Sequence, residues 1–411
     1  MKPGEYYGRK PTILFNNLFF ILGGLLSTLA DKKCLFIGRF ISGIGIGTTS
    51  VMVPVLLAEI SPDDCRGTIT TMHQVVLTFS ILISSLVGYG FVTYVSHGWQ
   101  YCQALEVIPS LLMLIFSSWV PESPKWLISN NNKDEAITVL KSLRENEYDV
   151  DNEIIQMVEE TSSDCSSDEV TWKEVFLNKK GLFIGCALMF IQAFTGINSV
   201  VFYSTTIFGF AGFKQAILAT SSFGAVNFIS TCISAYIIDI YGRKVLLFNG
   251  TIIMTVSLVV LSVALLSPSS SSQGIIAVIA VLTYTVGFAI GLGAVVWVML
   301  SELMPTRSRT KAVSVFLSIN WIGNFVIAIG SLLTIDALGG VNSSMTTDET
   351  QEAEKHGVAY LYIIFAIVSC ISCGYIYTMV PETKGKKPED FQDSTSAPLL
   401  QSESSSIDNK A

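Results

Sequence analysis

Side-chain amides and tryptophans inside long apolar runs are the residues of this sequence that could bind a ligand. The candidates are Gln74, Gln192, Asn198, Asn227, Asn320 and Asn324, with Trp297 and Trp321 as aromatic walls. An amide both donates and accepts hydrogen bonds, as each hydroxyl of a polyhydroxylated ligand requires, and an aromatic ring can cover an apolar C–H face. Taken one at a time, each amide could equally serve to hold two helices together.

The composition is that of a membrane protein. Half of the residues are hydrophobic, 14% are charged against about 25% in soluble domains, and the mean hydropathy is +0.54. A spanning helix needs about 20 apolar residues, so the sequence predicts ten spans. They lie near 11–30, 34–57, 72–95, 101–120, 181–206, 216–238, 245–266, 274–300, 312–335 and 358–380. The first is expected to be a retained helix, because it carries no small-residue cleavage site of a signal peptide.

The distribution of lysine and arginine predicts the orientation. Of the 25 basic residues, 20 lie in alternate segments of the chain, namely 1–10, 58–71, 121–180, 239–244, 301–311 and 381–411. By the positive-inside rule both termini are expected in the cytoplasm. The loop 121–180 is then inside, and the loop 336–357 is outside with "NSS" at 342–344 as a glycosylation sequon.

Other function classes are not supported. The net charge of −8 comes largely from the loop 121–180 and the tail, and it indicates no nucleic-acid partner. Cys370 and Cys373 form a CxxC inside an apolar stretch with no second pair or histidine nearby, which favours packing over a metal site. Because the three histidines are dispersed and no phosphate-binding loop occurs, we expect no cofactor and no enzymatic reaction.

Charged motifs recur in the same order in the two halves of the chain. The matched pairs are "EYYGRK" at 5–10 with "DIYGRK" at 239–244, "AEISPDDCRG" at 58–67 with "SELMPTRSRT" at 301–310, and "PESPK" at 121–125 with "PETKG" at 381–385. Two predicted spans separate successive motifs in both halves. This order indicates an internal parallel repeat, which is typical of transporters.

We expect the repeated charges to lie at cytoplasmic helix ends, where ion pairs between the two halves could close an inner gate. The gate residues are Arg9, Glu59, Arg66 and Glu122 in the first half and Arg243, Glu302, Arg309 and Glu382 in the second. Anchoring of basic residues at the membrane surface is the alternative, and Lys10, Lys244 and Lys311 could serve only for that. The repeated seven-residue spacing of Glu and Arg favours the gate.

The loop 121–180 is too long for a simple connection. "KDEAITVLKSLRE" places Ala136, Val139, Leu140 and Leu143 on one helical stripe, and "DNEIIQMVEE" follows with another apolar face. We expect short surface helices that cap the cytoplasmic gate, with a solvated linker as the alternative.

Together these motifs resemble those of the sugar porters of the major facilitator superfamily. The resemblance covers residues 4–385 and also rests on "GRF" at 38–40, "HQ" at 73–74, "GINSVVFYS" at 196–204, Trp297, "NW" at 320–321 and "VPETKG" at 380–385. It implies an all-α membrane protein with two pseudo-symmetric helical bundles, with 10 of an expected 12 transmembrane helices present. The implied parts are an N-terminal bundle of four helices at 1–120, a cytoplasmic loop at 121–180, a six-helix bundle at 181–385 and a disordered tail at 386–411.

The resemblance assigns sugar contacts to Gln74, Gln192, Asn198, Asn227, Trp297 and Asn320. This chain departs from the family pattern at three places. Ala193 replaces a second glutamine, so one hydrogen bond to the sugar is expected to be missing. "GLGAVVW" at 291–297 has no proline, so that helix is expected to bend less readily. Tyr6 replaces a positive charge, which thins the charged network.

The function implied is transport of a hexose or polyol, such as a glucose-like sugar, across the lipid bilayer by alternating access. Proton coupling stays open, because the acidic residue that the family carries in its first helix has no counterpart here. The alternative function is a non-transporting sugar sensor or a truncated isoform that regulates a full-length partner. The plasma membrane is favoured over endosomes, since "APLL" at 397–400 lacks an acid four residues before Leu399.

Two spans, 181–206 and 216–238, precede "DIYGRK", whereas none precedes "EYYGRK". The sequence therefore predicts a twelve-helix protein that lacks its first two helices. We expect residues 1–411 alone to fold poorly or to transport slowly, because polar cavity lining would meet lipid.

Overall fold

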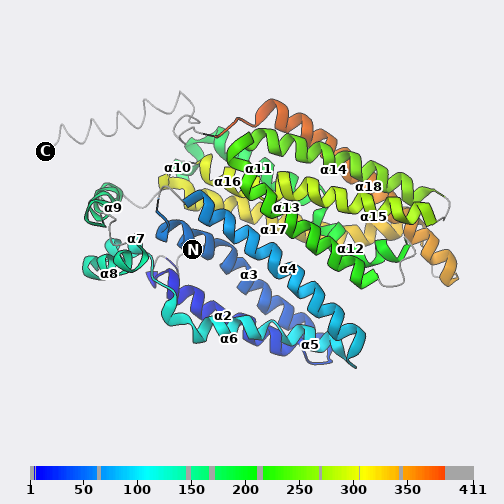
Figure 1. Ribbon diagram of the computed structural model, residues 1–411, viewed down its shortest axis with the longest axis horizontal. Helices are drawn as coiled ribbons and strands as arrows, with labels where there is room; N and C mark the ends of the chain where they lie inside the picture. The colour runs from blue at the N-terminus through cyan, green and yellow to red at the C-terminus, as the bar shows by residue number, and fades with distance from the viewer. Residues whose placement is uncertain are drawn as a thin grey trace. The chain divides into compact units, whose positions relative to one another are not determined.

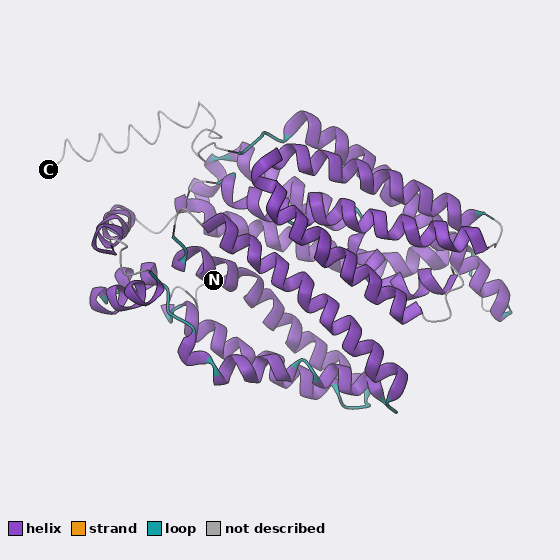
Figure 2. Ribbon diagram, viewed as in Figure 1, coloured by secondary structure: helices purple, strands orange, loops and turns teal. Residues whose placement is uncertain are grey.

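The computed structural model describes residues 4, 6–62, 66–144, 150–165, 172–210, 216–267, 271–304, 306–341 and 346–384, which form helices and short connections (Figures 1 and 2). These described residues include no strand. The chain divides into two compact units, the first of Met1–His73 and Leu86–Thr171 and the second of Gln74–Ser85 and Trp172–Ala411. The predicted tail at 386–411 and the sequon at 342–344 lie outside the described residues.

The helices of the N-terminal part follow one another closely. They are α2 (Arg9–Ser27), α3 (Lys32–Ile60), α4 (Arg66–Tyr94), α5 (Gly98–Ala104), α6 (Val107–Ile115), η1 (Ser117–Trp119), α7 (Pro124–Ser129), α8 (Lys133–Leu143) and α9 (Val150–Cys165). Within the first unit α2 packs along α3 and α6. A small cluster of Ile13, Met52 and Leu56 is buried between these helices.

The second unit contains the longer helical bundle. Its elements are α10 (Trp172–Leu177), α11 (Lys179–Phe194), α12 (Ile197–Phe210), α13 (Ala216–Tyr241), α14 (Arg243–Leu266), α15 (Ser271–Phe288), the π-helical η2 (Ala289–Gly293), α16 (Val295–Glu302), α17 (Thr306–Gly339) and α18 (Thr347–Met379). The helix α14 packs against α15 and α18, and α17 packs against α11 and α18. The large side chains of Phe208, Tyr284, Phe316 and Tyr362 are fully buried in the core of this unit.

Nine helical segments within the described ranges are long and apolar enough to cross a membrane, and they correspond to nine of the ten predicted spans. The expected span over 101–120 is instead divided into α5, α6 and η1. Pro109 explains the break between α5 and α6, because proline has no N–H to donate to the carbonyl of Leu105. The carbonyl of Leu105 accepts from the N–H of Ile108 instead, at 3.1 Å.

Residues 124–144 and 150–165 form short helices with a core of their own. Leu127, Ile128, Ala136 and Leu140 are buried together with Val150 and Met157 of α9. The side chain of Arg144 is only 3% exposed and forms two hydrogen bonds with the Glu153 carboxylate, at 2.7 and 3.0 Å. Its Nη1 atom also donates to the carbonyl of Ile60 at 3.0 Å. Arg144 therefore ties α9 to the end of α3.

Candidate functional site

A break in a spanning helix lies at the centre of the candidate site. The segment predicted as one span at 181–206 consists of α11 and α12, separated at Thr195 and Gly196. Gly196 has a φ of +93°, and a Cβ atom there would lie 2.4 Å from the ring of Phe365. The hydroxyl of Tyr284 donates to the carbonyl of Thr195 at 3.1 Å. This bond satisfies a carbonyl that the break deprives of its helical partner.

Four side-chain amides around this break form a continuous hydrogen-bonded chain. The Nδ2 atom of Asn198 donates to Oδ1 of Asn324 at 2.6 Å, and Nδ2 of Asn324 donates to Oδ1 of Asn320 at 3.1 Å. The Nδ2 atom of Asn320 donates to Oε1 of Gln192 at 2.9 Å. Finally, Nε2 of Gln192 donates to the carbonyl of Leu292 at 2.8 Å. The chain of amides thus links α12, α17, α11 and η2.

The two ends of this amide chain differ. Gln192 and Asn320 are 6% and 7% exposed, whereas Asn198 and Asn324 are half-buried. Because every amide donates toward Leu292, the Oδ1 atom of Asn198 stands at the acceptor end. It accepts no hydrogen bond from any part of the chain that the structure describes. The Asn198 end can therefore both accept from and donate to a hydroxyl.

The structure brings together three of the six residues that the sequence assigns to sugar contact, namely Gln192, Asn198 and Asn320. Asn324, which was a candidate from its position in a span, completes the chain of amides. Within the described ranges, no hydrogen bond joins the side chains of Gln74, Asn227 or Trp297 to these amides.

The three remaining residues have other surroundings. Asn227 is buried on α13, where its backbone carbonyl accepts from the Thr231 hydroxyl at 2.8 Å. Trp297 is partly buried against the core of the second unit. Gln74 is half-buried on α4, and Trp321 is 44% exposed on α17. The expectation that all six assigned residues line one cavity stays a prediction.

A π-helical turn at 289–293 bears on the expectation that this helix bends less readily. The missing prolines predicted a helix that bends less readily, but η2 interrupts the helix before Trp297. A π turn shifts the backbone hydrogen bonds and is itself a cause of bending. Side chains from neighbouring helices donate to two carbonyls of this turn: Ser234 to Ile290 at 3.3 Å and Gln192 to Leu292 at 2.8 Å.

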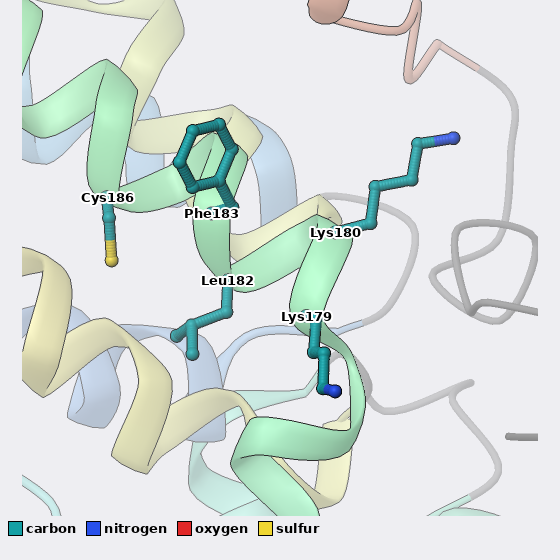
Figure 3. Close-up of a pocket in the computed structure, with 5 residues that line it drawn as sticks. All are labelled: Lys179, Lys180, Leu182, Phe183 and Cys186. Carbon is teal, nitrogen blue, oxygen red and sulfur yellow. The ribbon is translucent and has the colours of Figure 1, made fainter.

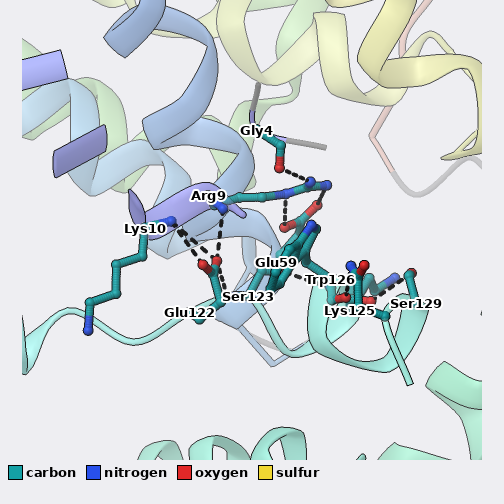
Figure 4. Close-up of polar contacts among 10 residues, drawn as sticks. Gly4, Arg9, Lys10, Glu59, Glu122, Ser123, Lys125, Trp126 and Ser129 are labelled. Carbon is teal, nitrogen blue, oxygen red and sulfur yellow. Dashed lines mark hydrogen bonds and ion pairs between the residues drawn. The ribbon is translucent and has the colours of Figure 1, made fainter. Parts of the chain in front are cut away.

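The repeated charged motifs form the same arrangement in each half. In the first half, Arg9 makes two side-chain hydrogen bonds to the Glu59 carboxylate, both at 3.0 Å (Figure 4). The backbone N–H groups of Arg9 and Lys10 donate to Glu122 at 2.9 and 3.2 Å. The Glu122 carboxylate thereby caps the N-terminus of α2, where negative charge is favourable.

In the second half, Arg243 bonds to Oε1 of Glu302 through Nε and Nη2 at 3.2 and 3.0 Å. The backbone N–H groups of Arg243 and Lys244 donate to Glu382 at 2.9 and 3.0 Å. The Thr383 hydroxyl donates to the other oxygen of Glu302 at 2.5 Å. The sequence repeat is thus also a repeat of hydrogen bonds.

A glycine with positive φ precedes the arginine in both halves. Gly8 has a φ of +101° and Gly242 a φ of +86°. A Cβ atom at these positions would lie 2.4 Å from Glu122 Oε2 and 2.7 Å from Glu382 Oε2, respectively. Glycine therefore allows each carboxylate to reach the helix end.

The pKa of Glu382 reflects this capping. Burial by itself would raise the pKa of the carboxyl, but backbone N–H donors from Lys384, Arg243, Lys244 and Thr383 outweigh it and lower the pKa below the usual glutamate range. Hydrogen bonds to the ionised form have this effect because they stabilise the charge.

The ion pairs described for the gate residues lie within each half. The side chain of Arg66 lies outside the described residues, and Nε of Arg309 donates to the carbonyl of Met304 at 3.4 Å. Pairing between the halves stays a prediction. No group of three or more His, Cys, Asp or Glu within the described ranges is arranged to hold a metal ion.

Comparison with known proteins decides the family. Residues 1–394 match the model of the family described as Sugar (and other) transporter. The chain belongs to this family. It is therefore a multi-pass membrane protein, and the predicted resemblance to the sugar porters is confirmed.

Relatives of the sugar transporter family match along almost the whole chain. The glucose transporter GlcP of Staphylococcus epidermidis is 31% identical over 391 residues, which cover 94% of this chain and 82% of GlcP. The D-xylose transporter of Levilactobacillus brevis is 30% identical over 394 residues, with 94% and 81% covered. The solved structure of the proton:xylose symporter XylE bound to 6-bromo-6-deoxy-D-glucose matches with a TM-score of 0.77, 25% identity, and 94% and 83% covered. The major facilitator fold is confirmed.

Proposed function

We propose that this sugar transporter moves a hexose or polyol, such as a glucose-like sugar, across the bilayer by alternating access. The observation that carries the proposal is the open end of the amide chain at Asn198, next to the break between α11 and α12. A sugar hydroxyl can donate to Oδ1 of Asn198 and accept from a remaining N–H of Asn198 or Asn324. Relatives whose names specify glucose and xylose support the same substrate class.

The proposed sugar contacts are Gln74, Gln192, Asn198, Asn227, Trp297 and Asn320, to which we add Asn324. Buried Gln192 and Asn320 hold the orientation of the half-buried amides, so the sugar meets donors and acceptors whose directions are already set. Such preorganisation lowers the cost of binding.

The two charged arrangements serve, in this proposal, to hold the ends of α2 and α14 during the change of access. Both lie at helix ends that the basic-residue count assigns to the cytoplasm. In each half one arginine connects its own helix to a glutamate of another, Arg9 to Glu59 on α3 and Arg243 to Glu302 on α16. We place the protein in the plasma membrane.

The test is sugar counterflow in proteoliposomes that contain the full chain. We expect preloaded unlabelled glucose or xylose to drive uptake of the labelled sugar, and Asn198→Ala to abolish most of it. Asn17→Ala is the matched control, because Asn17 is a buried intramembrane amide whose described bond is to its own helix. Sugar binding without counterflow would contradict transport and favour a sensor. Accumulation driven by an imposed pH gradient would establish proton coupling.

A further inference from the structure

A groove on the second unit begins at two lysines and continues along apolar side chains. One part is lined by Lys179, Lys180, Phe183 and Cys186 of α11 (Figure 3). Phe183 and Cys186 also line the next part, together with Phe190. The opposite walls there include Ile319 of α17 and Ile371 and Tyr375 of α18. The two parts share Phe183 and Cys186, so they adjoin along α11 and lead from charged to apolar surroundings.

Among the described residues, the two lysines have no partner that explains their position. Both side chains are exposed, and in Figure 3 that of Lys180 extends away from α11. Neither forms an ion pair with any residue in the described ranges. They stand at the N-terminus of a 16-residue helix with no acidic residue in its first turn. The positive end of the helix dipole repels cations at this position. A bound anion would offset this repulsion, because it attracts both the lysines and the helix N-terminus.

The order of charged and apolar residues along the groove matches the order of head group and acyl chains in a lipid. The span that contains α11 begins at Lys179, so the lysines lie where a spanning helix enters the membrane and the apolar walls lie deeper. Phe183 and Ile371 are 64% and 69% exposed, as expected for walls that meet acyl chains. Basic residues beside spanning helices are suited to anionic head groups.

Two aromatic rings, those of Phe183 and Tyr375, line the groove near the lysines. The hydroxyl oxygen of Tyr375 is buried and makes no hydrogen bond within the described part of the chain. Its ring packs edge-on against Phe183 at a centroid distance of 6.4 Å. Phe183 follows Lys179 by four residues, a rise of about 6 Å along the helix. The Tyr375 ring therefore stands beside Phe183, about one helical turn along α11 from Lys179, and forms part of the groove wall.

We propose that this groove is a specific site for an anionic phospholipid. The phosphate binds Lys179 and Lys180 at the start of α11, and one acyl chain lies along Phe183, Cys186 and Phe190. Because α11 also carries Gln192, the lipid binds the same helix as the proposed sugar site.

The test is native mass spectrometry of the full chain with equimolar phosphatidylglycerol and phosphatidylcholine of identical acyl chains. We expect about tenfold more retained phosphatidylglycerol, given that each lysine near the surface contributes to binding of anionic lipid. K179Q/K180Q should remove this preference. K32Q/K33Q is the matched control, because Lys32 and Lys33 are also an exposed pair at the start of a spanning helix, α3, and should leave the preference unchanged. Ala187→Trp, which narrows the groove without altering charge, should reduce binding of both lipids.

Three results would overturn the proposal. The first is that K179Q/K180Q and K32Q/K33Q reduce the preference for phosphatidylglycerol equally, which would indicate an effect of general surface charge. The second is full competition by glycerol phosphate without acyl chains, which would indicate a phosphate site and not a lipid site. The third is a dimer that Ala187→Trp dissociates, which would place a second copy of the chain in the groove. Thermal unfolding of each variant confirms that it is folded before lipid binding is compared.

Discussion

The Nδ2 atom of Asn320 donates a hydrogen bond of 2.9 Å to Oε1 of Gln192, and both side chains are buried. This bond joins α17 to α11 and determines which end of each amide faces the next residue. With Oε1 engaged, Gln192 presents its Nε2 group to the carbonyl of Leu292. Asn320 in turn offers Oδ1 to Asn324. The buried pair thus sets the direction of the whole chain of amides.

Asn320→Ala should therefore weaken sugar binding although Asn320 is not at the open end. The substitution leaves the buried Oε1 atom of Gln192 without its described donor, at a cost of about 1–3 kcal/mol. We expect both a lower unfolding temperature and about tenfold weaker sugar affinity, measured by thermal unfolding and equilibrium binding. Unchanged binding would show that the amide directions do not matter to the sugar.

Asn198→Ala should separate binding from stability. Asn198 is half-buried and donates only one described side-chain bond, to Asn324. We expect sugar affinity to fall about five- to twelvefold, since a lost hydrogen bond costs about 1–1.5 kcal/mol, with a smaller change in unfolding temperature than Asn320→Ala causes. The same two measurements on both variants check this order. A larger loss of stability for Asn198→Ala would mean that it is a structural amide.

Gly196→Ala should destabilise the break between α11 and α12. A φ of +93° is strained for alanine, and the added Cβ would meet the Phe365 ring at 2.4 Å, so we expect a cost of about 1–3 kcal/mol. Gly209→Ala on α12 is the control, because its Cβ would meet no atom within 4 Å. Denaturant unfolding of both variants measures the difference. Equal effects would indicate that the break tolerates an ordinary helical residue.

Glu382 should make stability depend on pH on the acidic side. Its pKa is lower in the folded chain than in the unfolded chain, so the capping contribution is fully present above the unfolded pKa and is lost as pH falls through the folded pKa. Glu382→Gln should be less stable at neutral pH and should show a flatter acid limb in thermal unfolding. The exposed Glu352 provides the control Glu352→Gln, which should retain the wild-type profile. A steep acid limb in Glu382→Gln would assign the effect to another group.

Arg144→Lys should loosen α9 from the rest of the first unit. Lysine cannot reproduce the paired bonds to Glu153 together with the bond to the Ile60 carbonyl. We expect faster hydrogen exchange over residues 150–165 in the variant. Arg39→Lys is the control, since the Arg39 side chain is half exposed and lies 3.8 Å from Glu106, and exposed pairs contribute little. Unchanged exchange over 150–165 would show that the apolar cluster alone holds α9.

Local patterns in the sequence determined the helices, the membrane class and the family motifs. The apolar runs predicted nine spans that the structure contains, because a run of sufficient length must form a helix wherever the bilayer offers no other hydrogen-bond partners. The spacing of Asn320 and Asn324 also placed these amides on one helical face, four residues apart. The repeated charged motifs predicted equivalent positions for Arg9 and Arg243.

Only the tertiary structure decided which polar groups meet. The Gln192 amide donates to a carbonyl 100 residues away on a π turn. Asn227 also lies in an apolar span, but its side chain makes no described hydrogen bond. The break at Gly196 likewise depends on Phe365 and Tyr284 of other helices, whereas the break before Pro109 follows from a backbone donor that the sequence itself lacks. Sequence spacing defines the face of a helix, but the rotation and packing of several helices together determine which faces share a hydrogen bond.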